Sequence, residues 1–473
     1  MENTLHVAIV SSPGIGHLIP ALVLAQRLAA HHDVHVTVLV ITAANASPPE
    51  TSSCLHLRDD LIRVVHLPPP DITRLVTPST PVVAQICLTV RKSLPLIRSA
   101  LASMDRRPDA LVVDFFCTET APLAAELAIP KYVLVPTTAW FTALSLYCPL
   151  LDREIKGQYV DQVEPLRIPG CKPLRPDDVV DPMLDREAPV YHEYRAMGER
   201  LLLFDGILLN TWEDLERHTL NALRKNEAWS WSIPVHPIGP LTRPVDQVEE
   251  GSNRKLMCWL DRQPEESVVL VSFGSGGTLS ADQTRELARG LEMSGQRFVW
   301  VVRSPNNGGS ADAAFFDSNG RCCGKTTFDF LPEGFQGRVG DRGFLVAGWV
   351  PQAAVLEHRA VGGFVSHCGW NSTLESVTRG VPMVAWPLYS EQRMNAAFLA
   401  EEAGAALRVS LSGGVVSGEE VERAVRGLMA KGQVVREKVR CLRRSAMEAL
   451  KEGGTSHKAM RDMLHTISLR KSN

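Results

Sequence analysis

A histidine and an aspartate follow two apolar stretches that have the pattern of buried strands. His17 comes after the turn Pro13–Gly16, which ends the apolar stretch 5–12, and Asp114 lies near the end of the stretch 110–116. If both stretches are strands of one parallel sheet, both side chains lie at its carboxyl edge. A carboxylate that binds one imidazole nitrogen orients the ring and keeps the other nitrogen basic. The two residues therefore predict a general base that takes a proton from a substrate hydroxyl.

A second chemical feature is an apolar stretch followed by the start of a helix. Residues Gly362–Ser366 predict a short buried strand. A helix is expected over Asn371–Thr378, with Asn371 or Ser372 as its N-cap. A helix N-terminus presents backbone N–H groups and a positive dipole end, and both favour phosphate. His367, Asn371 and Ser372 add side-chain donors, so the sequence predicts a phosphate site at this point.

Nearby residues are suited to the other parts of a nucleotide sugar. Trp349 follows another apolar stretch, and an exposed indole there can stack on a nucleobase. Glu375 lies one helical turn beyond the expected phosphate site and can accept hydrogen bonds from ribose hydroxyls. Glu391 and Gln392 follow a further apolar stretch and form a pair suited to sugar hydroxyls. The single segment 349–392 would thus bind base, ribose, diphosphate and sugar in order.

The segment 349–392 resembles the signature segment of plant UDP-sugar-dependent glycosyltransferases of specialised metabolism (family 1), and the rest of the chain resembles them nearly from end to end. The resemblance is strongest to the branch that glucosylates small phenols such as hydroquinone. It implies an α/β architecture of the GT-B type, in which two Rossmann-like parallel-sheet domains face each other across a cleft. It also implies that His17 is the catalytic base and Asp114 its partner, that UDP-glucose is the donor, and that neither a metal nor a cofactor is needed.

The resemblance further indicates which residues contact the donor. The glycine-rich turn 273–278 is suited to phosphate, and the resemblance points to Ser275 within it. Trp370 and Gln392 match the pattern that favours UDP-glucose, whereas Glu391 stands where an aspartate is often found. The predicted donor-binding residues are Ser275, Trp349, Val350, Gln352, His367, Trp370, Asn371, Ser372, Glu375, Glu391, Gln392 and Thr138.

The acceptor pocket is expected to be apolar and aromatic, as a phenolic ring requires. Its predicted lining residues are Ile86, Val90, Phe115, Phe116, Trp140, Leu144 and Tyr389. Because adjacent strand residues point to opposite faces, one of Phe115 and Phe116 is expected in the core and the other in the pocket.

Alternating strand and helix patterns predict the elements that position these residues. In the first half, strands are expected at 5–12, 34–41, 62–67, 110–116, 131–135 and 206–210, and helices at 18–30, 80–104, 118–128, 139–150 and 212–225. In the second half, strands are expected at 268–273, 297–302, 343–346, 362–366 and 382–386, and helices at 280–294, 371–378, 391–403 and 418–429. This alternation predicts two parallel sheets with right-handed crossovers, and ligands in the cleft between the halves.

The predicted domain boundaries follow from this pattern. Residues 1–240 are expected to form an acceptor-binding domain and residues 256–450 a UDP-sugar-binding domain. The proline-rich stretch 234–255, and 241–255 in particular, is expected to link them. The resemblance implies that the helical tail 451–473 packs back on the first domain. The polar segment 304–327 is expected to be a mobile surface insertion.

The composition limits the classes to which the protein belongs. A chain of 473 residues suits two domains, and a net charge of −3 provides no basic surface for nucleic acid. No apolar stretch is long enough to span a membrane, and the N-terminus lacks the basic region of a signal peptide. The ten cysteines are scattered without metal-ligand spacing, which is typical of reduced cytosolic thiols. We therefore expect a cytoplasmic monomer that binds a UDP-sugar and a small aromatic acceptor, without a metal.

Other functions remain open on the sequence alone. The pattern Gly14-x-Gly16 suggests an NAD(P)-dependent oxidoreductase, but Ile19 replaces the third glycine and no acidic residue ends the second strand. A catalytically silent sugar-nucleotide-binding protein would lack His17 and Asp114, which are both present. The same fold and donor could also glucosylate carbon, nitrogen or sulfur of the acceptor. The sequence does not identify the acceptor, the position glucosylated or the strictness of the preference for glucose.

Overall fold

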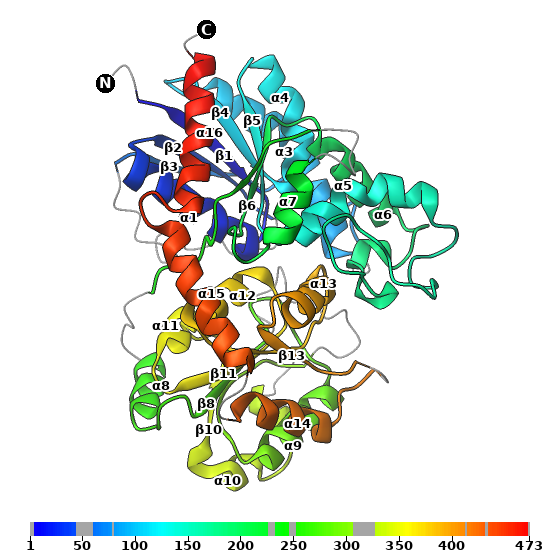
Figure 1. Cartoon of the computed structure of the whole chain (residues 1–473), viewed down its shortest axis with the longest axis vertical. Helices are drawn as coiled ribbons and strands as arrows, with labels where there is room; N and C mark the ends of the chain where they lie inside the picture. The colour runs from blue at the N-terminus through cyan, green and yellow to red at the C-terminus, as the bar shows by residue number, and fades with distance from the viewer. Residues whose placement is uncertain are drawn as a thin grey trace. The chain divides into compact units, whose positions relative to one another are not determined.

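The computed structural model describes residues 4–43, 60–77, 80–225, 232–245, 252–305, 327–411, 414–430 and 434–471. The chain forms two compact units. Unit 1 contains residues 1–243 together with 446–473, and unit 2 contains residues 244–445. Each unit has one parallel sheet with helices packed against it (Figure 1). The predicted α/β class with two Rossmann-like sheets is confirmed.

The sheet of unit 1 has seven strands in the order β3-β2-β1-β4-β5-β6-β7. The strands are β1 His6–Ser11, β2 His35–Ile41, β3 Ile62–Leu67, β4 Ala110–Asp114, β5 Lys131–Val135, β6 Gly206–Leu209 and β7 Val235–Pro237. Every residue of β1 and β4 is buried. Continuous apolar strands of this kind form parallel sheets because helices cover both faces.

The helices of unit 1 are α1 Ile15–His32, α3 Val82–Ala102, α4 Ala121–Glu126, α5 Ala139–Glu154, α6 Pro189–Leu201, α7 Arg217–Lys225 and α16 Thr455–Lys471. The last of these, α16, lies against the sheet of unit 1 although it is far from it in the sequence (Figure 1). Met460, Met463 and Ile467 share a buried core with α1 and β1. The hydroxyl of Ser456 donates a 2.6 Å hydrogen bond to the carbonyl of Gly239. The core of unit 1 is therefore built from both ends of the chain.

The sheet of unit 2 has six strands in the order β10-β9-β8-β11-β12-β13. The strands are β8 Val268–Ser272, β9 Arg297–Val302, β10 Gly343–Ala347, β11 Val361–Ser366, β12 Met383–Ala385 and β13 Ala406–Arg408. The helices are α8 Ser252–Asp261, α9 Ala281–Ser294, α10 Phe335–Val339, α11 Gln352–Glu357, α12 Trp370–Arg379, α13 Gln392–Ala397, α14 Gly418–Met429 and α15 Val434–Leu450. The boundary between the two units falls within α15. None of the described helices is both long and apolar enough to span a membrane.

Each sheet reverses its strand order at one place. In unit 1 the chain builds outward from β1 to β3 and then continues on the other side with β4, which pairs with β1. In unit 2, β8 and β11 are the corresponding neighbours. Loops at such a pair of strands diverge, so a crevice opens at their carboxyl ends and ligands bind there. The candidates for binding and catalysis are therefore the residues that follow β1, β4, β8 and β11.

Several predicted boundaries were wrong for local reasons. The stretch 241–255 is not a linker throughout, because α8 begins at Ser252, and β7 lies inside the broader stretch 234–255. The strand expected over 110–116 ends at Asp114, whose side chain caps a 3-10 helix over Phe115–Thr120. Helix α12 begins at Trp370 with Gly369 as its N-cap, so neither Asn371 nor Ser372 is the cap.

Some elements were not predicted, and one prediction falls outside the described residues. Helices α6 and α11 were missed, and α7 begins at Arg217 rather than at 212. The expected helix 391–403 is divided into α13 and a π-helical segment, Phe398–Glu402. Residues 306–326 of the predicted insertion lie outside the described residues.

Candidate active-site residues in each unit

In unit 1, the predicted base and its partner lie at the carboxyl ends of β1 and β4. His17 Nδ1 is 2.8 Å from Asp114 Oδ1. The imidazole is 18% exposed and the carboxylate 1%. A carboxylate next to Nδ1 favours the tautomer in which Nδ1 carries the proton and Nε2 is the basic nitrogen. This is the arrangement that a general base requires.

The turn after β1 determines the position of His17. Gly14 has a φ of 107°, which side chains with a Cβ rarely adopt, and this allows the strand to pass directly into α1. Because α1 begins at Ile15, earlier than predicted, His17 lies in its first turn, and its N–H donates a 3.1 Å hydrogen bond to the carbonyl of Gly14. Gly14 therefore permits the turn that positions the imidazole of His17.

Asp114 is held by donors that the sequence did not reveal. The hydroxyl of Ser12, the last residue before the turn, donates a 2.6 Å hydrogen bond to Asp114 Oδ2. The backbone N–H of Phe116 donates to the same oxygen at 3.1 Å. Together with His17, these donors fix the position of both carboxylate oxygens. Ser12 is 0% exposed, so it is a positioning residue. No spacing signal distinguishes it from the neighbouring Ser11.

Aromatic rings lie next to the imidazole. The ring of Phe116 contacts that of His17 edge-on, with 5.1 Å between the centroids. Phe115 is buried and packs in the same way on Phe141. The two phenylalanines thus divide as expected, with Phe115 in the core and Phe116 beside the predicted base.

The other predicted acceptor residues are largely inaccessible. Ile86 and Val90 on α3, and Trp140 and Leu144 on α5, are at most 2% exposed. Tyr389, the remaining one, belongs to unit 2 and is partly buried. Among the predicted acceptor residues of unit 1, Phe116 alone is partly exposed.

Thr138 has a structural role at the start of α5. It is the N-cap, and its side-chain oxygen accepts a 3.0 Å hydrogen bond from the N–H of Phe141. The fully buried carboxylate of Glu216 accepts hydrogen bonds from the next two N–H groups, those of Ala139 and Trp140, at 2.9 and 3.2 Å. A negative charge at a helix N-terminus is favourable, so Glu216 fixes the start of α5. The sequence did not indicate this role for Glu216.

A network of charges joins the elements around Asp114. Arg91 on α3 donates to Glu119, in the 3-10 helix after Asp114, through Nε at 3.0 and 3.1 Å. Arg91 Nη2 also donates to Glu193 on α6 at 2.9 Å. Arg200, at the end of α6, lies 3.5 Å from Glu119. These bonds connect the helix that carries Ile86 and Val90 to the segment that carries Phe115 and Phe116.

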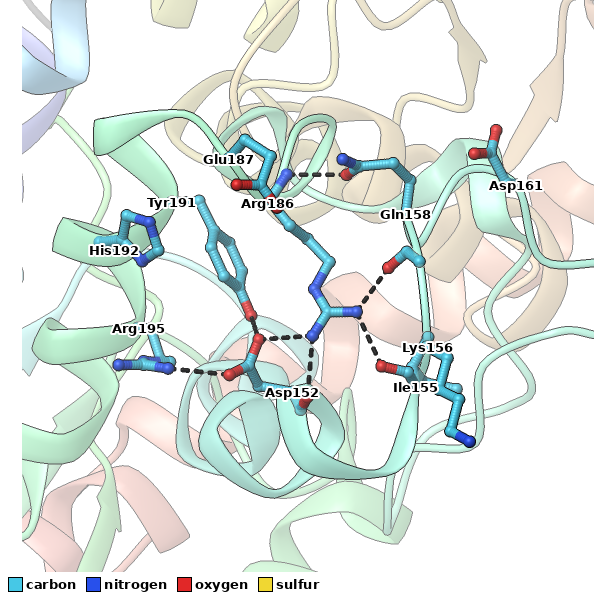
Figure 2. A pocket seen from close by; sticks show the side chains of 11 residues that line it. Asp152, Ile155, Lys156, Gln158, Asp161, Arg186, Glu187, Tyr191, His192 and Arg195 are labelled. Atoms are coloured by element: carbon cyan, nitrogen blue, oxygen red, sulfur yellow. Dashed lines mark hydrogen bonds and ion pairs between the residues drawn. The ribbon is translucent and has the colours of Figure 1, made fainter.

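Unit 1 also contains a polar pocket of about 560 Å³ between the end of α5 and the start of α6 (Figure 2). Arg186 lies across it and donates to the carbonyls of Asp152 and Ile155 and to the Asp152 carboxylate. Arg195 and Tyr191 donate to the same carboxylate. Burial opposes ionisation of Asp152, but these bonds outweigh it and lower its pKa to about 2. The charged side chains at the centre of the pocket are paired with one another. They therefore stabilise the end of α5, and the pocket does not indicate a ligand.

In unit 2, the predicted phosphate site lies at the carboxyl ends of β8 and β11. His367, directly after β11, is enclosed by two glycines. A Cβ on Gly274 would lie 2.5 Å from its Cε1, and a Cβ on Gly369 would lie 2.4 Å from its Nε2. Burial, together with the charge of Arg303, lowers the pKa of His367 to about 4. The imidazole is therefore neutral at neutral pH and can donate a hydrogen bond without carrying a charge.

The turn after β8 brings Ser275 to the same place. Ser275 is exposed, while the adjacent Gly276 and Gly277 are buried. A Cβ on Gly277 would lie 2.1 Å from the carbonyl oxygen of Phe273, so only glycine permits this turn. The carbonyl of Ser275 accepts a hydrogen bond from Arg303, at the end of β9. Exposed backbone and hydroxyl groups of this turn can bind phosphate.

Three of the predicted donor-binding residues form one hydrogen-bond network. Gln352 Nε2, at the start of α11, donates to the hydroxyl of Ser372 at 2.9 Å and to Glu375 Oε2 at 2.8 Å. Ser372 and Glu375 lie on α12, so Gln352 orients the carboxylate predicted to bind ribose. Trp349, after β10, is 52% exposed, which leaves indole surface for stacking, whereas Val350 is buried.

The remaining donor-binding predictions lie at the starts of α12 and α13. Trp370 is buried and contacts Phe398 edge-on at 6.1 Å, and Asn371 lies partly buried in the first turn of α12. Gln392 Oε1 accepts hydrogen bonds from the N–H groups of Leu388 and Tyr389, at 2.9 and 3.1 Å, so it shapes the loop after β12.

Glu391 is held by its neighbours. Its carboxylate accepts hydrogen bonds from the hydroxyl of Ser390 at 2.7 Å and from Asn395 Nδ2 at 3.3 Å. Asn395 Nδ2 also donates to the carbonyl of Cys368, at 3.0 Å. These bonds connect Glu391 to the segment between β11 and α12. Within the described part of the chain, no cluster of His, Cys, Asp and Glu has the arrangement of a metal site.

Comparisons with known proteins show the family to which the chain belongs. Residues 247–445 match the family model described as UDP-glucoronosyl and UDP-glucosyl transferase. The chain is 46% identical over 462 residues to anthocyanidin 3-O-glucosyltransferase 5 of Manihot esculenta, covering 96% of this chain and 94% of that protein. It is 41% identical over 468 residues to hydroquinone glucosyltransferase of Rauvolfia serpentina, covering 98% of both. The crystal structure of TcCGT1 in complex with UDP matches with a TM-score of 0.91 at 42% identity, covering 99% of this chain and 100% of that one.

The two parallel-sheet units and the family match define a GT-B enzyme that uses UDP-sugars. The similarity extends over nearly the whole chain at more than 40% identity. The chain belongs to the plant family 1 UDP-glycosyltransferases, and it is a UDP-dependent glycosyltransferase. The predicted family, including its likeness to hydroquinone glucosyltransferases, is confirmed, and the oxidoreductase alternative is wrong.

Proposed function

We propose that this enzyme transfers glucose from UDP-glucose to the hydroxyl of a small phenolic or flavonoid-like acceptor, with inversion at the anomeric carbon. The observation that carries the proposal is the 2.8 Å contact between His17 Nδ1 and the buried Asp114, next to the ring of Phe116. A base beside an aromatic ring suits a phenolic acceptor. The names of two relatives specify anthocyanidin and hydroquinone, which supports this class of acceptor.

Unit 1 activates the acceptor in this mechanism. His17 Nε2 takes the proton of the phenol as the phenolic oxygen attacks the anomeric carbon. Asp114 stabilises the imidazolium that forms, and Ser12 and the N–H of Phe116 keep the carboxylate in position. The acceptor oxygen is itself the nucleophile, so the protein needs no covalent intermediate. One displacement on an α-linked donor gives a β-glucoside.

Unit 2 holds the donor in this mechanism. Trp349 stacks on the uracil, Val350 lies beside it, and Glu375, oriented by Gln352, binds the ribose. The Ser275 turn, His367 and the first turn of α12 bind the diphosphate. Glu391 and Gln392 bind the hydroxyls of the glucose. Hydrogen-bond donors stabilise the departing UDP, so the reaction proceeds without a metal ion or a cofactor.

The type of bond that is formed is open to direct test. A carbon or nitrogen nucleophile on the same aromatic ring would use the same base and donor. An acceptor screen with UDP-glucose, in which products are identified by mass and by NMR, distinguishes O-, C- and N-glucosides and gives the anomeric configuration. We expect β-O-glucosides of small phenols. An α-glucoside would contradict the inverting mechanism, and no transfer to any phenol would contradict the acceptor class.

The base is tested by substitution of His17. In His17→Ala, we expect transfer to phenols to fall at least about 100-fold, because general-base catalysis contributes about that much or more. Binding of UDP, measured by isothermal titration, should be unchanged, because the residues assigned to the nucleotide all belong to unit 2. Unchanged turnover would remove His17 from the mechanism.

A further inference from the structure

Arg303, which the sequence did not single out, lies beside the predicted phosphate site of unit 2. It follows β9, and β9 pairs with β8, the strand that leads into the Ser275 turn. Its Nη1 donates a hydrogen bond to the carbonyl oxygen of Ser275. Its charge also contributes to lowering the pKa of His367. The guanidinium is therefore close to two of the groups assigned to the diphosphate.

Within the described part of the chain, no carboxylate balances the charge of Arg303. The residue is partly buried, and this burial lowers its pKa. Its other electrostatic interaction is with Tyr389, and among the described residues no Asp or Glu forms a salt bridge with it. Removing a guanidinium from water without an anionic partner is unfavourable. A planar guanidinium is also well suited to binding phosphate oxygens. The guanidinium of Arg303 is thus suited to binding an anionic ligand such as a phosphate.

We propose that Arg303 is a donor-binding residue whose guanidinium binds the diphosphate of the UDP-sugar while one of its nitrogens holds the Ser275 turn. This inference rests on the donor site proposed above. Arg303 supplies the positive charge that His367 cannot supply, because His367, with a pKa of about 4, is neutral at neutral pH.

The same charge acts in the transfer step. As the bond between the anomeric carbon and the diphosphate oxygen breaks, its electron pair moves to that oxygen, while the acceptor oxygen forms its bond to the carbon and its proton goes to His17. The negative charge on UDP therefore grows toward the transition state. A fixed guanidinium stabilises this charge more strongly than that of the bound substrate, which accelerates the reaction.

The test compares ligands that differ only in their phosphates. Uridine, UMP and UDP are titrated calorimetrically into the wild type, Arg303→Gln and Arg303→Lys. The control is Arg297→Gln, because Arg297 lies at the opposite end of β9 and is exposed. In Arg303→Gln, we expect the affinity for UDP to fall about 10- to 100-fold through the loss of charge-assisted hydrogen bonds, while uridine changes less than about twofold. The affinity of Arg303→Lys for UDP should lie between those of the wild type and Arg303→Gln. The affinity of Arg297→Gln should match that of the wild type.

Each outcome has a distinct meaning. If the wild type does not bind UDP, the proposed donor and this inference both fail. If the wild type binds UDP and Arg303→Gln binds it equally well, the inference is wrong while the proposed function stands. If the affinities of Arg303→Gln for uridine and for UDP fall by the same factor, Arg303 only supports the fold of the turn, and the inference is again wrong.

Discussion

Asp114 shows how single residues set the chemistry of unit 1. Its carboxylate is 1% exposed, and its oxygens are bonded to His17, Ser12 and the N–H of Phe116. The three donors hold this nearly inaccessible carboxylate in one orientation. In unit 2, burial and the neighbouring charge of Arg303 both lower the pKa of His367.

The role of Ser12 is testable with a matched control on the same strand end. In Ser12→Ala, we expect kcat/KM for a phenol to fall about tenfold, because one charge-assisted hydrogen bond to Asp114 is lost, and UDP affinity to stay unchanged. Ser11→Ala is the control, since the hydroxyl of Ser11 donates only to the carbonyl of Ser12. Equal effects of the two substitutions would contradict the assignment.

His367 makes the stability of unit 2 depend on pH. Its pKa is lowered from 6.5 to about 4, so the unfolded chain binds a proton in a pH range where the folded chain does not. Stability from this residue is present above pH 6.5 and is lost as the pH falls from 6.5 toward 4, by about 3 kcal/mol in total. Between pH 7 and 4.5, the wild type should lose about 2–3 kcal/mol of unfolding free energy through this residue. His367→Gln should not show this loss when both proteins are unfolded in urea. Identical pH dependences would show that the imidazole is accessible to protons in the folded state.

At the scale of elements, each unit places its candidate site residues where the strand order of its sheet reverses. Turns after β1 and β8 and residues after β4 and β11 meet at these places. Glycines allow the close approaches. Gly14 permits β1 to enter α1 directly, and Gly274 permits the turn after β8 to contact the ring of His367. The sequences of these turns are therefore as restricted as the candidate site residues that they position.

The contact between Gly274 and His367 predicts the effect of a single methyl group. In Gly274→Ala, the new Cβ would lie 2.5 Å from His367 Cε1, at a φ of 76°. We expect UDP affinity to fall at least about tenfold and unfolding stability to fall by about 2–4 kcal/mol, through crowding as well as backbone strain. Gly453→Ala is the control, because Gly453 also has a φ of 76° but a Cβ there would meet no atom within 4 Å. If both variants lose equal stability and Gly274→Ala still binds UDP normally, crowding against His367 is not significant.

Much of this arrangement was predictable from the sequence, for identifiable reasons. Apolar strands such as β1, β4, β8 and β11 lie within one or two residues of their predicted bounds, because their hydrophobic pattern is strong. Residues that follow them, such as His17 and His367, could be named because parallel strands end at a common edge. Ser12, Glu216 and Arg303 could not be named. Their roles depend on partners distant in the sequence; Ser12 and Asp114, for example, are 102 positions apart.

At the scale of the whole molecule, the path of the chain shapes unit 1. The chain leaves unit 1 after residue 243 and returns to it at residue 446. On its return, α16 places Met460, Met463 and Ile467 in the same buried core as α1 and β1. Arg470 near its end forms an ion pair with Asp205, just before β6. This helix is thus part of the core of unit 1.

The contribution of α16 is measured by charging its buried face. Met463 is 0% exposed, so Met463→Lys places an unpaired charge in the core, and we expect a loss of about 3–5 kcal/mol in the stability of unit 1. Leu469→Lys, on the same helix, is the control, because Leu469 is 55% exposed and its substitution should cost less than about 0.5 kcal/mol. Both are measured by urea unfolding. Equal midpoints for the two variants would show that α16 is dispensable for unit 1.

The return of the chain through α16 also has a consequence during protein synthesis. On the ribosome, every strand of unit 2 emerges before α16 does. The nascent unit 1 therefore waits, with the apolar surface of α1 and β1 uncovered, for on the order of ten seconds or more at ordinary elongation rates. The rate of elongation between residues 244 and 455 sets the length of this wait.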